Sequence, residues 1–223
     1  KAVLDEEILT IERMGVEIIT NCKIGVDMPF ETIRNDYDAV LLGIGAWVST
    51  GVGCKGEDAE GVIGGIDFLR KVVRNEEIKL GEKVAIVGGG NTAMDACRTA
   101  VRLGAKEVYN IYRRTKDEMP ADMVEIEEAE EEGVIFKNLT NPIEVVADEN
   151  GHVKEVVLQV MELGEPDASG RRSPRPVEGK TETLAIDTMI LAIGQAVDAS
   201  IVDCDKTRKN AIAYDKDTFM TSI

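Results

Sequence analysis

The sequence predicts an α/β fold in which a parallel β-sheet is followed by an antiparallel β-meander. The first observation is the order strand, glycine turn, helix and strand over residues 84–112, which is the pattern of a βαβ unit. The second is a series of β-prone runs over 134–163, two of which are joined by Asn150-Gly151, a strong hairpin signal. The third is an apolar run over 184–193, which indicates a return to a buried strand.

Four elements are predicted before the βαβ unit. Apolar residues at helical spacing predict a helix over 4–15, which ends at a glycine. Short β-prone runs predict strands over 16–20 and 38–43, and the second is expected to be buried because it is almost entirely apolar. After a glycine-rich loop, residues 66–74 predict a short helix.

The βαβ unit itself is sharply defined. Residues 84–87 are β-prone and apolar, and the helix that follows the glycine turn ends at Gly104. Residues 107–112 form the second strand, so the unit has the expected length of about 30 residues. A strongly acidic helix is predicted over 121–132, and its charges are expected to form a solvated face.

The meander is predicted from runs over 134–139, 143–147 and 153–163. A loop is expected over 164–180, because this segment is polar. Residues 184–193 are then predicted to form one buried strand, so the chain returns from the meander to the core.

The turn inside the βαβ unit carries a specific pattern of small residues. Gly88-x-Gly90-x-x-Ala93 matches the dinucleotide-binding fingerprint in the strand–turn–helix context that the fingerprint requires. Gly88 permits the tight turn, Gly90 lets the backbone approach a pyrophosphate, and Ala93 lets the helix pack closely on the strand. Asn91 or Thr92 can cap the helix or bind a phosphate oxygen at its positive end. A turn without a ligand is the alternative, but three consecutive glycines sacrifice chain entropy without filling a core.

A second Gly-x-Gly-x-x-Gly stands at 51–56, and its surroundings differ. It lies in a loop, and the acidic segment 57–60 follows where the fingerprint needs an apolar helix. Carboxylates beside the glycines would repel a pyrophosphate. We therefore expect no phosphate site at 51–56.

An arginine pair after the second strand favours NADP(H) over NAD(H). NAD sites carry an acidic residue about 20 positions after the fingerprint, where it binds the ribose hydroxyls. Here Arg113 lies 25 positions after Gly88 and is followed by Arg114. Two guanidinium groups suit a 2′-phosphate through charge-assisted bidentate bonds. The alternative is two surface arginines that balance the acidic helix.

The composition excludes several classes of function. A net charge of −16, from 26 basic and 42 acidic residues, argues against nucleic acid or another polyanion as a partner. No apolar run reaches the roughly 18 residues of a membrane span, and no signal peptide opens the chain. The four cysteines include no Cys-x-x-Cys pair, so we expect reduced, mostly buried thiols in a cytoplasmic protein.

The side chains offer no catalytic set of their own. His152 is the only histidine and lies beside the predicted hairpin tip. The sequence contains no metal-binding cluster, Ser/His/Asp set or Walker loop. We therefore name no catalytic residue, and the reactive groups are expected to belong to cofactors.

The motifs together resemble a known family. The segments that carry the resemblance are Gly-Gly-Gly-Asn-Thr-Ala-Met-Asp (88–95), Tyr-Arg-Arg (112–114), Glu-Met-Pro-Ala (118–121), and the runs 37–46, 161–172 and 187–195. They are similar to the NADPH-binding domain of the glutamate synthase small subunit and of related pyridine nucleotide–flavin oxidoreductases. Nearly the whole chain is covered by the likeness.

The resemblance implies a reaction in which NADPH gives a hydride to the N5 atom of FAD. Electrons then pass to iron–sulfur clusters and on to the glutamate synthase large subunit or a ferredoxin-type acceptor. In this family the glycine turn would hold the diphosphate, the arginine pair the 2′-phosphate, and residues 192–195 would pass near the nicotinamide. The cofactor-binding residues expected on this basis are Gly88, Gly89, Gly90, Asn91, Thr92, Arg113, Arg114, Ala192, Ile193 and Gly194.

The resemblance also divides the chain. The family's FAD fingerprint and cluster-ligating cysteines are absent from the sequence. We expect residues 1–45 and 196–223 to be partial segments of the FAD-binding domain of a longer parent chain. They would flank a Rossmann-like NADPH-binding domain over 46–195. These residues alone are then expected neither to bind FAD tightly nor to be active.

Two other classes of function are alternatives to a module of a flavoprotein oxidoreductase. The first is a non-catalytic module that senses a dinucleotide without turnover. The second is a disulfide reductase similar to thioredoxin reductase, which shares this architecture. Such reductases need a redox-active Cys-x-x-Cys in the NADPH domain, and the sequence has none.

Overall fold

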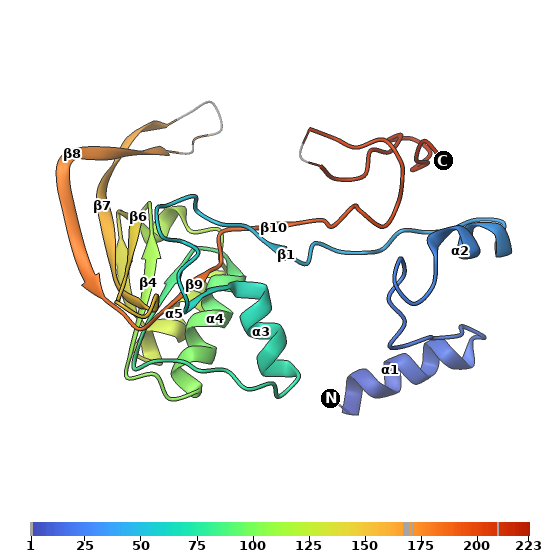
Figure 1. The fold of residues 1–223 in the computed structure, drawn as a ribbon, viewed down its shortest axis with the longest axis horizontal. Coiled ribbons are helices and arrows are strands. Elements are labelled where there is room, and N and C mark those ends of the chain that lie inside the picture. The colour runs from blue at the N-terminus through green and yellow to red at the C-terminus, as the bar shows by residue number, and fades with distance from the viewer. Residues whose placement is uncertain (1, 167–169, 171, 209) are drawn as a thin grey trace. The chain divides into compact units, whose positions relative to one another are not determined.

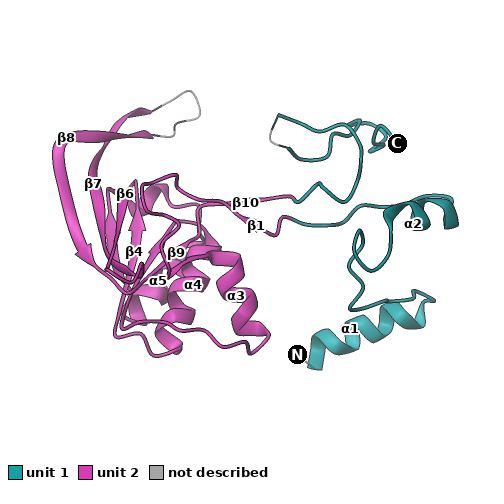
Figure 2. Cartoon of the chain, in the orientation of Figure 1, with its two compact units in different colours: residues 1–45, 198–223 teal, residues 46–197 magenta. Residues whose placement is uncertain are grey.

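The computed structural model describes the chain except for residues 1, 167–169, 171 and 209. Its contacts divide the chain into two compact units (Figure 2). Unit 1 comprises residues 1–45 and 198–223, and unit 2 comprises residues 46–197. In the part of the chain that is described, no helix is long and apolar enough to cross a membrane.

Unit 2 is built on a five-stranded parallel sheet with the strand order β2-β9-β3-β4-β5. The strands, in that order, are β2 (Val62–Gly64), β9 (Thr188–Leu191), β3 (Lys83–Val87), β4 (Glu107–Tyr112) and β5 (Ile135–Asn138). Strands β3 and β4 pair in parallel and are joined by helix α4 (Asn91–Arg102). The predicted βαβ unit and the α/β fold class are therefore confirmed.

Helices cover one face of the parallel sheet, and antiparallel strands cover the other (Figure 1). Val84 and Ile86 of β3 belong to a core on the helical side, with buried residues of α3 (Gly65–Val73) and α4. Ala85 and Val87 belong to a second core, with buried residues of the antiparallel strands. Because successive side chains of a strand point to opposite faces, a strand buried on both faces is apolar throughout.

The antiparallel strands form a second sheet with the order β6-β7-β8. They are β6 (Thr140–Ala147), β7 (Val153–Pro166) and β8 (Arg172–Ala185). The predicted hairpin joins β6 to β7, where the Asp148 carboxylate accepts the amides of Asn150 and His152. Two short strands, β1 (Val48–Ser49) and β10 (Gln195–Ala196), pair separately.

The polar loop predicted over 164–180 is wrong for all of its described residues except Gly170, which lies in a bend. Most of this segment belongs to β8, which pairs with β7 from Arg172 onward; residues 167–169 and 171 lie outside the described residues. Pro174 and Pro176 fit within β8 because it is an edge strand, where a proline need not remove a ladder hydrogen bond.

The single strand predicted over 184–193 is also wrong. It breaks at Ile186 and Asp187, where the chain leaves β8 and enters β9 in the other sheet. The Asp187 carboxylate accepts the amide of Lys83 at 2.9 Å, and this contact fixes the corner between the two sheets. All four cysteines are free, but only Cys97 is buried and the other three are half-buried.

The described residues of unit 1 form two helices, α1 (Ala2–Arg13) and α2 (Phe30–Asp36). Helix α1 agrees with the predicted helix over 4–15, but the strands predicted over 16–20 and 38–43 are not formed. A strand needs a hydrogen-bonded neighbour, and these runs pair with none among the described residues. Leu41 is accordingly 95% exposed rather than buried.

The acidic helix α5 (Met123–Glu131) does not present only a solvated face, as was expected. The Arg98 guanidinium of α4 makes ion pairs with Glu125, Glu128 and Glu132 at N–O distances of 2.6–2.8 Å. The Arg98 side chain is 16% exposed, so the carboxylates converge on a largely buried cation. These ion pairs link α5 and the residue after it to α4.

Replacement of this cation tests the role of the ion pairs. We expect Arg98→Met to lower the thermal denaturation temperature, because three neighbouring carboxylates would lose the charge that offsets their repulsion. Arg102→Met is the matched control, since Arg102 pairs with Glu132 but its side chain is 60% exposed. Equal effects of the two substitutions in calorimetry would contradict this account.

Candidate functional site

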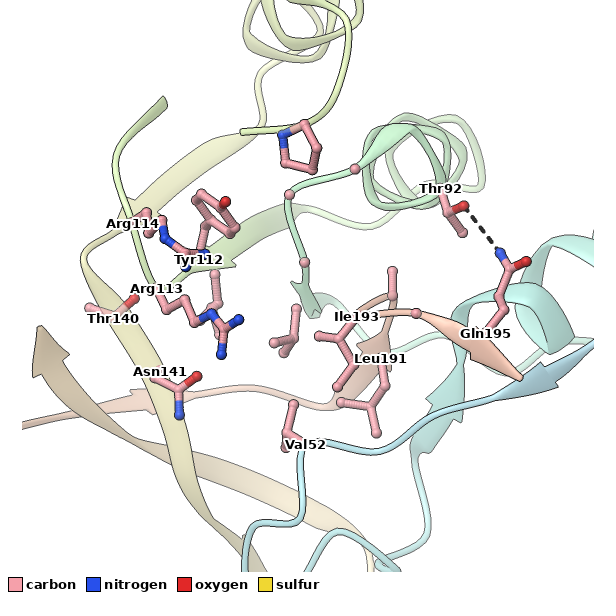
Figure 3. A pocket seen from close by; sticks show the side chains of 18 of the residues that line it. Val52, Thr92, Tyr112, Arg113, Arg114, Thr140, Asn141, Leu191, Ile193 and Gln195 are labelled. Atoms are coloured by element: carbon pink, nitrogen blue, oxygen red, sulfur yellow. Dashed lines mark hydrogen bonds between the residues drawn. The ribbon is translucent and has the colours of Figure 1, made fainter. Parts of the chain in front are cut away.

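The register of the parallel sheet brings three strand ends to one edge. Val87, the last residue of β3, pairs with Ile111 of β4 and with Leu191 of β9. Parallel strands end at the same edge of a sheet, so the residues that follow these strands meet there. They surround a cavity of about 430 Å³ (Figure 3).

Nearly all the predicted site residues line this cavity. Asn91 is the exception, because it does not line the cavity. The predicted residues at the cavity are Gly88, Gly89, Gly90, Thr92, Arg113, Arg114, Ala192, Ile193 and Gly194. The lining residues that sequence reasoning did not name as cofactor-binding are Val52, Ile66, Val87, Ile111, Tyr112, Pro120, Thr140, Asn141, Leu191 and Gln195.

The three glycines of the turn are required for different reasons. Gly88 has φ +147°, and a Cβ there would lie 2.3 Å from the carbonyl oxygen of Ala192. A Cβ at Gly89 would lie 2.5 Å from the ring of Tyr112. A Cβ at Gly90 would find its nearest atom 3.9 Å away. Gly88 and Gly89 are thus required by the protein itself, whereas Gly90 leaves open space beside the cavity.

The turn exposes a row of backbone amide groups at the start of α4. The amides of Ala93 and Met94 donate to the Gly90 carbonyl. Within the described residues, the four preceding amides, those of residues 89–92, donate no hydrogen bond to the protein. Such amides, at the positive end of a helix dipole, form a site for an anion.

Neither Asn91 nor Thr92 caps α4, and the alternative, that one of them binds a phosphate oxygen, stays a prediction. The N-cap residue is Gly90, and no side chain caps the helix. The Asn91 side chain instead exchanges two hydrogen bonds with Asp122, at 2.9 and 3.0 Å. Thr92 Oγ1 accepts a hydrogen bond from Gln195 Nε2 at 3.4 Å (Figure 3). Asn91 therefore holds the segment before α5 against the turn.

The two arginines at the end of β4 have different surroundings. Arg113 is exposed, whereas Arg114 is 7% exposed and donates from Nε to the carbonyl of Arg172 at 2.9 Å. Both side chains reach the cavity (Figure 3). Glu118, in the 3-10 helix η1 (Lys116–Glu118), lies close enough to affect this charge. A hydrogen bond from Thr115 and the nearby arginines hold the pKa of Glu118 below its usual range.

The second glycine pattern, over 51–56, is filled by the chain itself. Glu57 Oε2 accepts the amides of Gly53 and Cys54 at 2.6 and 3.1 Å. A Cβ at Gly51 would lie 1.8 Å from Glu57 Oε1, so the loop encloses this carboxylate. Burial and the charge of Glu57 raise the pKa of the Cys54 thiol to about 11. An internal carboxylate thus occupies the place that an external anion would take.

Alanine substitutions distinguish the two functions of the turn. We expect Gly88→Ala to lower the free energy of unfolding by about 1–3 kcal/mol or more, because it combines a strained φ with a backbone clash. Gly90 has φ −98°, and a Cβ added there meets no close atom. Gly90→Ala should therefore change the free energy of unfolding by less than about 1 kcal/mol. Denaturant unfolding of both variants measures this difference. A stable Gly88→Ala protein would contradict the described geometry.

Comparison with known proteins identifies relatives of this arrangement. The pyridine nucleotide-disulphide oxidoreductase family matches residues 7–221. The NADP(+)-dependent formate dehydrogenase subunit beta of Moorella thermoacetica is 44% identical over 226 residues, which cover 99% of this chain and 32% of that protein. The glutamate synthase (NADPH) small chain of Escherichia coli K12 is 38% identical over 207 residues, which cover 86% of this chain and 44% of that protein.

A solved structure shows the same fold. Mycobacterium tuberculosis FprA in complex with NADPH matches with a TM-score of 0.66 and 18% identity, over 89% of this chain and 57% of FprA. The resemblance to the glutamate synthase small subunit is therefore confirmed by sequence, and the fold class by structure. The chain spans less than half the length of the two curated relatives.

Proposed function

The chain belongs to the pyridine nucleotide-disulphide oxidoreductase family, and on that premise we propose that unit 2 is the NADPH-binding module of a flavoprotein oxidoreductase. One observation carries the proposal. Of the described residues that line the cavity, the only charged ones are Arg113 and Arg114, and the same lining includes Gly89, Gly90 and Thr92, whose amides are free. In a chain with a net charge of −16, this cavity selects an anion.

The lining residues fit the parts of a phosphorylated dinucleotide. The amides of residues 89–92 would hold the diphosphate, because backbone N–H groups at a helix start bind phosphate oxygens. Arg113 and Arg114 would hold the 2′-phosphate, since a guanidinium group binds phosphate by paired hydrogen bonds. Ala192, Ile193 and Gly194 are uncharged and would face the nicotinamide.

The residues of the chain bind and orient, and the cofactors supply the chemistry. When bound, NADPH supplies a hydride that FAD can accept. Residues 191–194 have no acidic or basic side chain, so they supply no proton donor or acceptor group on this side of the cavity. Thr92 and Gln195 form a polar edge through their mutual hydrogen bond. No residue of the chain is assigned a catalytic role.

The wider assembly is part of the same proposal. Residues 1–45 and 196–223 would contribute to an FAD-binding domain of the same protein, and 46–195 would be the NADPH domain. Electrons would pass through iron–sulfur clusters to a partner such as the glutamate synthase large subunit or a ferredoxin-type acceptor. The relatives support this, because two of them are described as subunits of larger enzymes. The free thiols suit a cytoplasmic location.

Residues 1–223 alone are proposed to lack tight FAD binding and turnover. The support is that the second glycine pattern, over 51–56, is filled by Glu57 and offers no second nucleotide cradle. The absorbance spectrum of the purified protein tests this proposal. Bands of a bound flavin would contradict it.

Titration with the two nucleotides tests the proposed function. We expect Arg113→Ala to raise the dissociation constant for NADPH about 10- to 100-fold and that for NADH by less than about twofold. Only NADPH carries the 2′-phosphate that the exposed guanidinium would bind. Arg113 is preferred to Arg114, whose removal would also break a hydrogen bond to the backbone. Calorimetry provides both constants.

Arg74→Ala is the matched control, because Arg74 belongs to the same unit, is exposed and does not line the cavity. It should leave both constants unchanged. If NADH binds as tightly as NADPH and Arg113→Ala changes neither, the assignment of NADPH is wrong. If neither nucleotide binds, the proposed function is wrong.

A further inference from the structure

We propose that Asn110 is a positioning residue for the dinucleotide site: its buried side chain fixes the glycine turn so that the amides of the turn face the diphosphate. Asn110 lies in the middle of β4, is 0% exposed and does not line the cavity. The inference rests on the proposed function, since it concerns how the same cavity is kept ready for its ligand.

The side chain of Asn110 makes one short contact with the turn. Its Nδ2 donates to the carbonyl oxygen of Gly88 at 2.9 Å, and lies 3.8 Å from Sγ of the buried Cys97. The amide of Gly88 donates to the Ile111 carbonyl at 3.1 Å. Both polar groups of Gly88 are therefore held by adjacent residues of β4.

This contact determines the direction of an amide that faces the ligand. The Gly88 carbonyl and the Gly89 N–H belong to one peptide group, and in a trans peptide they point in opposite directions. Because Asn110 holds the carbonyl toward β4, the Gly89 N–H is directed away from β4, and Gly89 lines the cavity. The next peptide is held in the same way, since the Gly89 carbonyl accepts the amide of Ala121 at 3.0 Å.

Fold stability alone does not explain an asparagine at this position. Asn110 Oδ1 is buried and has no hydrogen-bond partner, and such a group destabilises the folded state. The other fully buried side chains around it on the helical side, such as Met94 and Ile86, are apolar. Glycines, moreover, leave the turn free to adopt other peptide orientations. The hydrogen bond from Asn110 Nδ2 to the Gly88 carbonyl explains why an asparagine stands here although its Oδ1 has no partner.

The test measures the binding of two ligands to the unaltered protein and to the Asn110→Leu variant. This substitution removes the hydrogen-bond donor and keeps a side chain of similar size. NADP+ contains the diphosphate, whereas adenosine 2′-phosphate contains only the adenosine and the 2′-phosphate. We expect Asn110→Leu to raise the dissociation constant for NADP+ about tenfold, the loss of roughly one hydrogen bond. The constant for adenosine 2′-phosphate should stay within about twofold.

Thr188→Val is the matched control. Thr188 is buried in the same sheet and its hydroxyl accepts the amide of Gly81, but it lies at the opposite end of β9 from the cavity. Thr188→Val should not raise the dissociation constant of one ligand more than that of the other. If Asn110→Leu weakens both ligands equally, or neither, Asn110 does not position the turn. If the unaltered protein binds neither ligand, the proposed function fails and this inference fails with it.

Discussion

The glycine turn between β3 and α4 depends on its position between two neighbouring strands, and the rest of the site depends on that turn. On one side Gly88 is held by β4, through its own amide and through the Asn110 side chain. On the other side the amide of Ala192 donates to the Val87 carbonyl at 2.8 Å, and the Ala192 carbonyl leaves no room for a Cβ at Gly88. The close approach of three backbones thus requires glycine and leaves the following amides free.

Charge then decides what these amides can bind. The two glycine patterns both present backbone amides, but Glu57 occupies the one at 51–56, and no carboxylate of a described residue lines the cavity beside the one at 88–90. Among the described residues, the charged groups that line the cavity at residues 88–90 are the guanidinium groups of Arg113 and Arg114, and Glu118, outside the cavity, partly balances their charge. An acidic protein can therefore hold a phosphorylated dinucleotide, because the local field at short range outweighs the average surface charge.

The sequence predicts the parts of this arrangement that depend on local chemistry. The βαβ unit, the hairpin at Asn150-Gly151 and the grouping of strand ends all follow from periodicity, turn residues and the rules of parallel sheets. The errors concern pairing over long distances. Strand β8 contains prolines that only an edge position explains. Residues 38–43 look like a strand, but no strand of the described chain pairs with them. Neither Asn110 nor the contact of Asn91 with Asp122 could be predicted, because the register and the fold bring those partners together.

A crystal structure of the protein with NADP+ is the most direct test of the central claim. The account predicts that the diphosphate lies against the amides of residues 89–92, within hydrogen-bonding distance. The 2′-phosphate should lie between Arg113 and Arg114, and Asn110 Nδ2 should still contact the Gly88 carbonyl. A diphosphate bound elsewhere, or a 2′-phosphate directed into solvent away from both arginines, would contradict it.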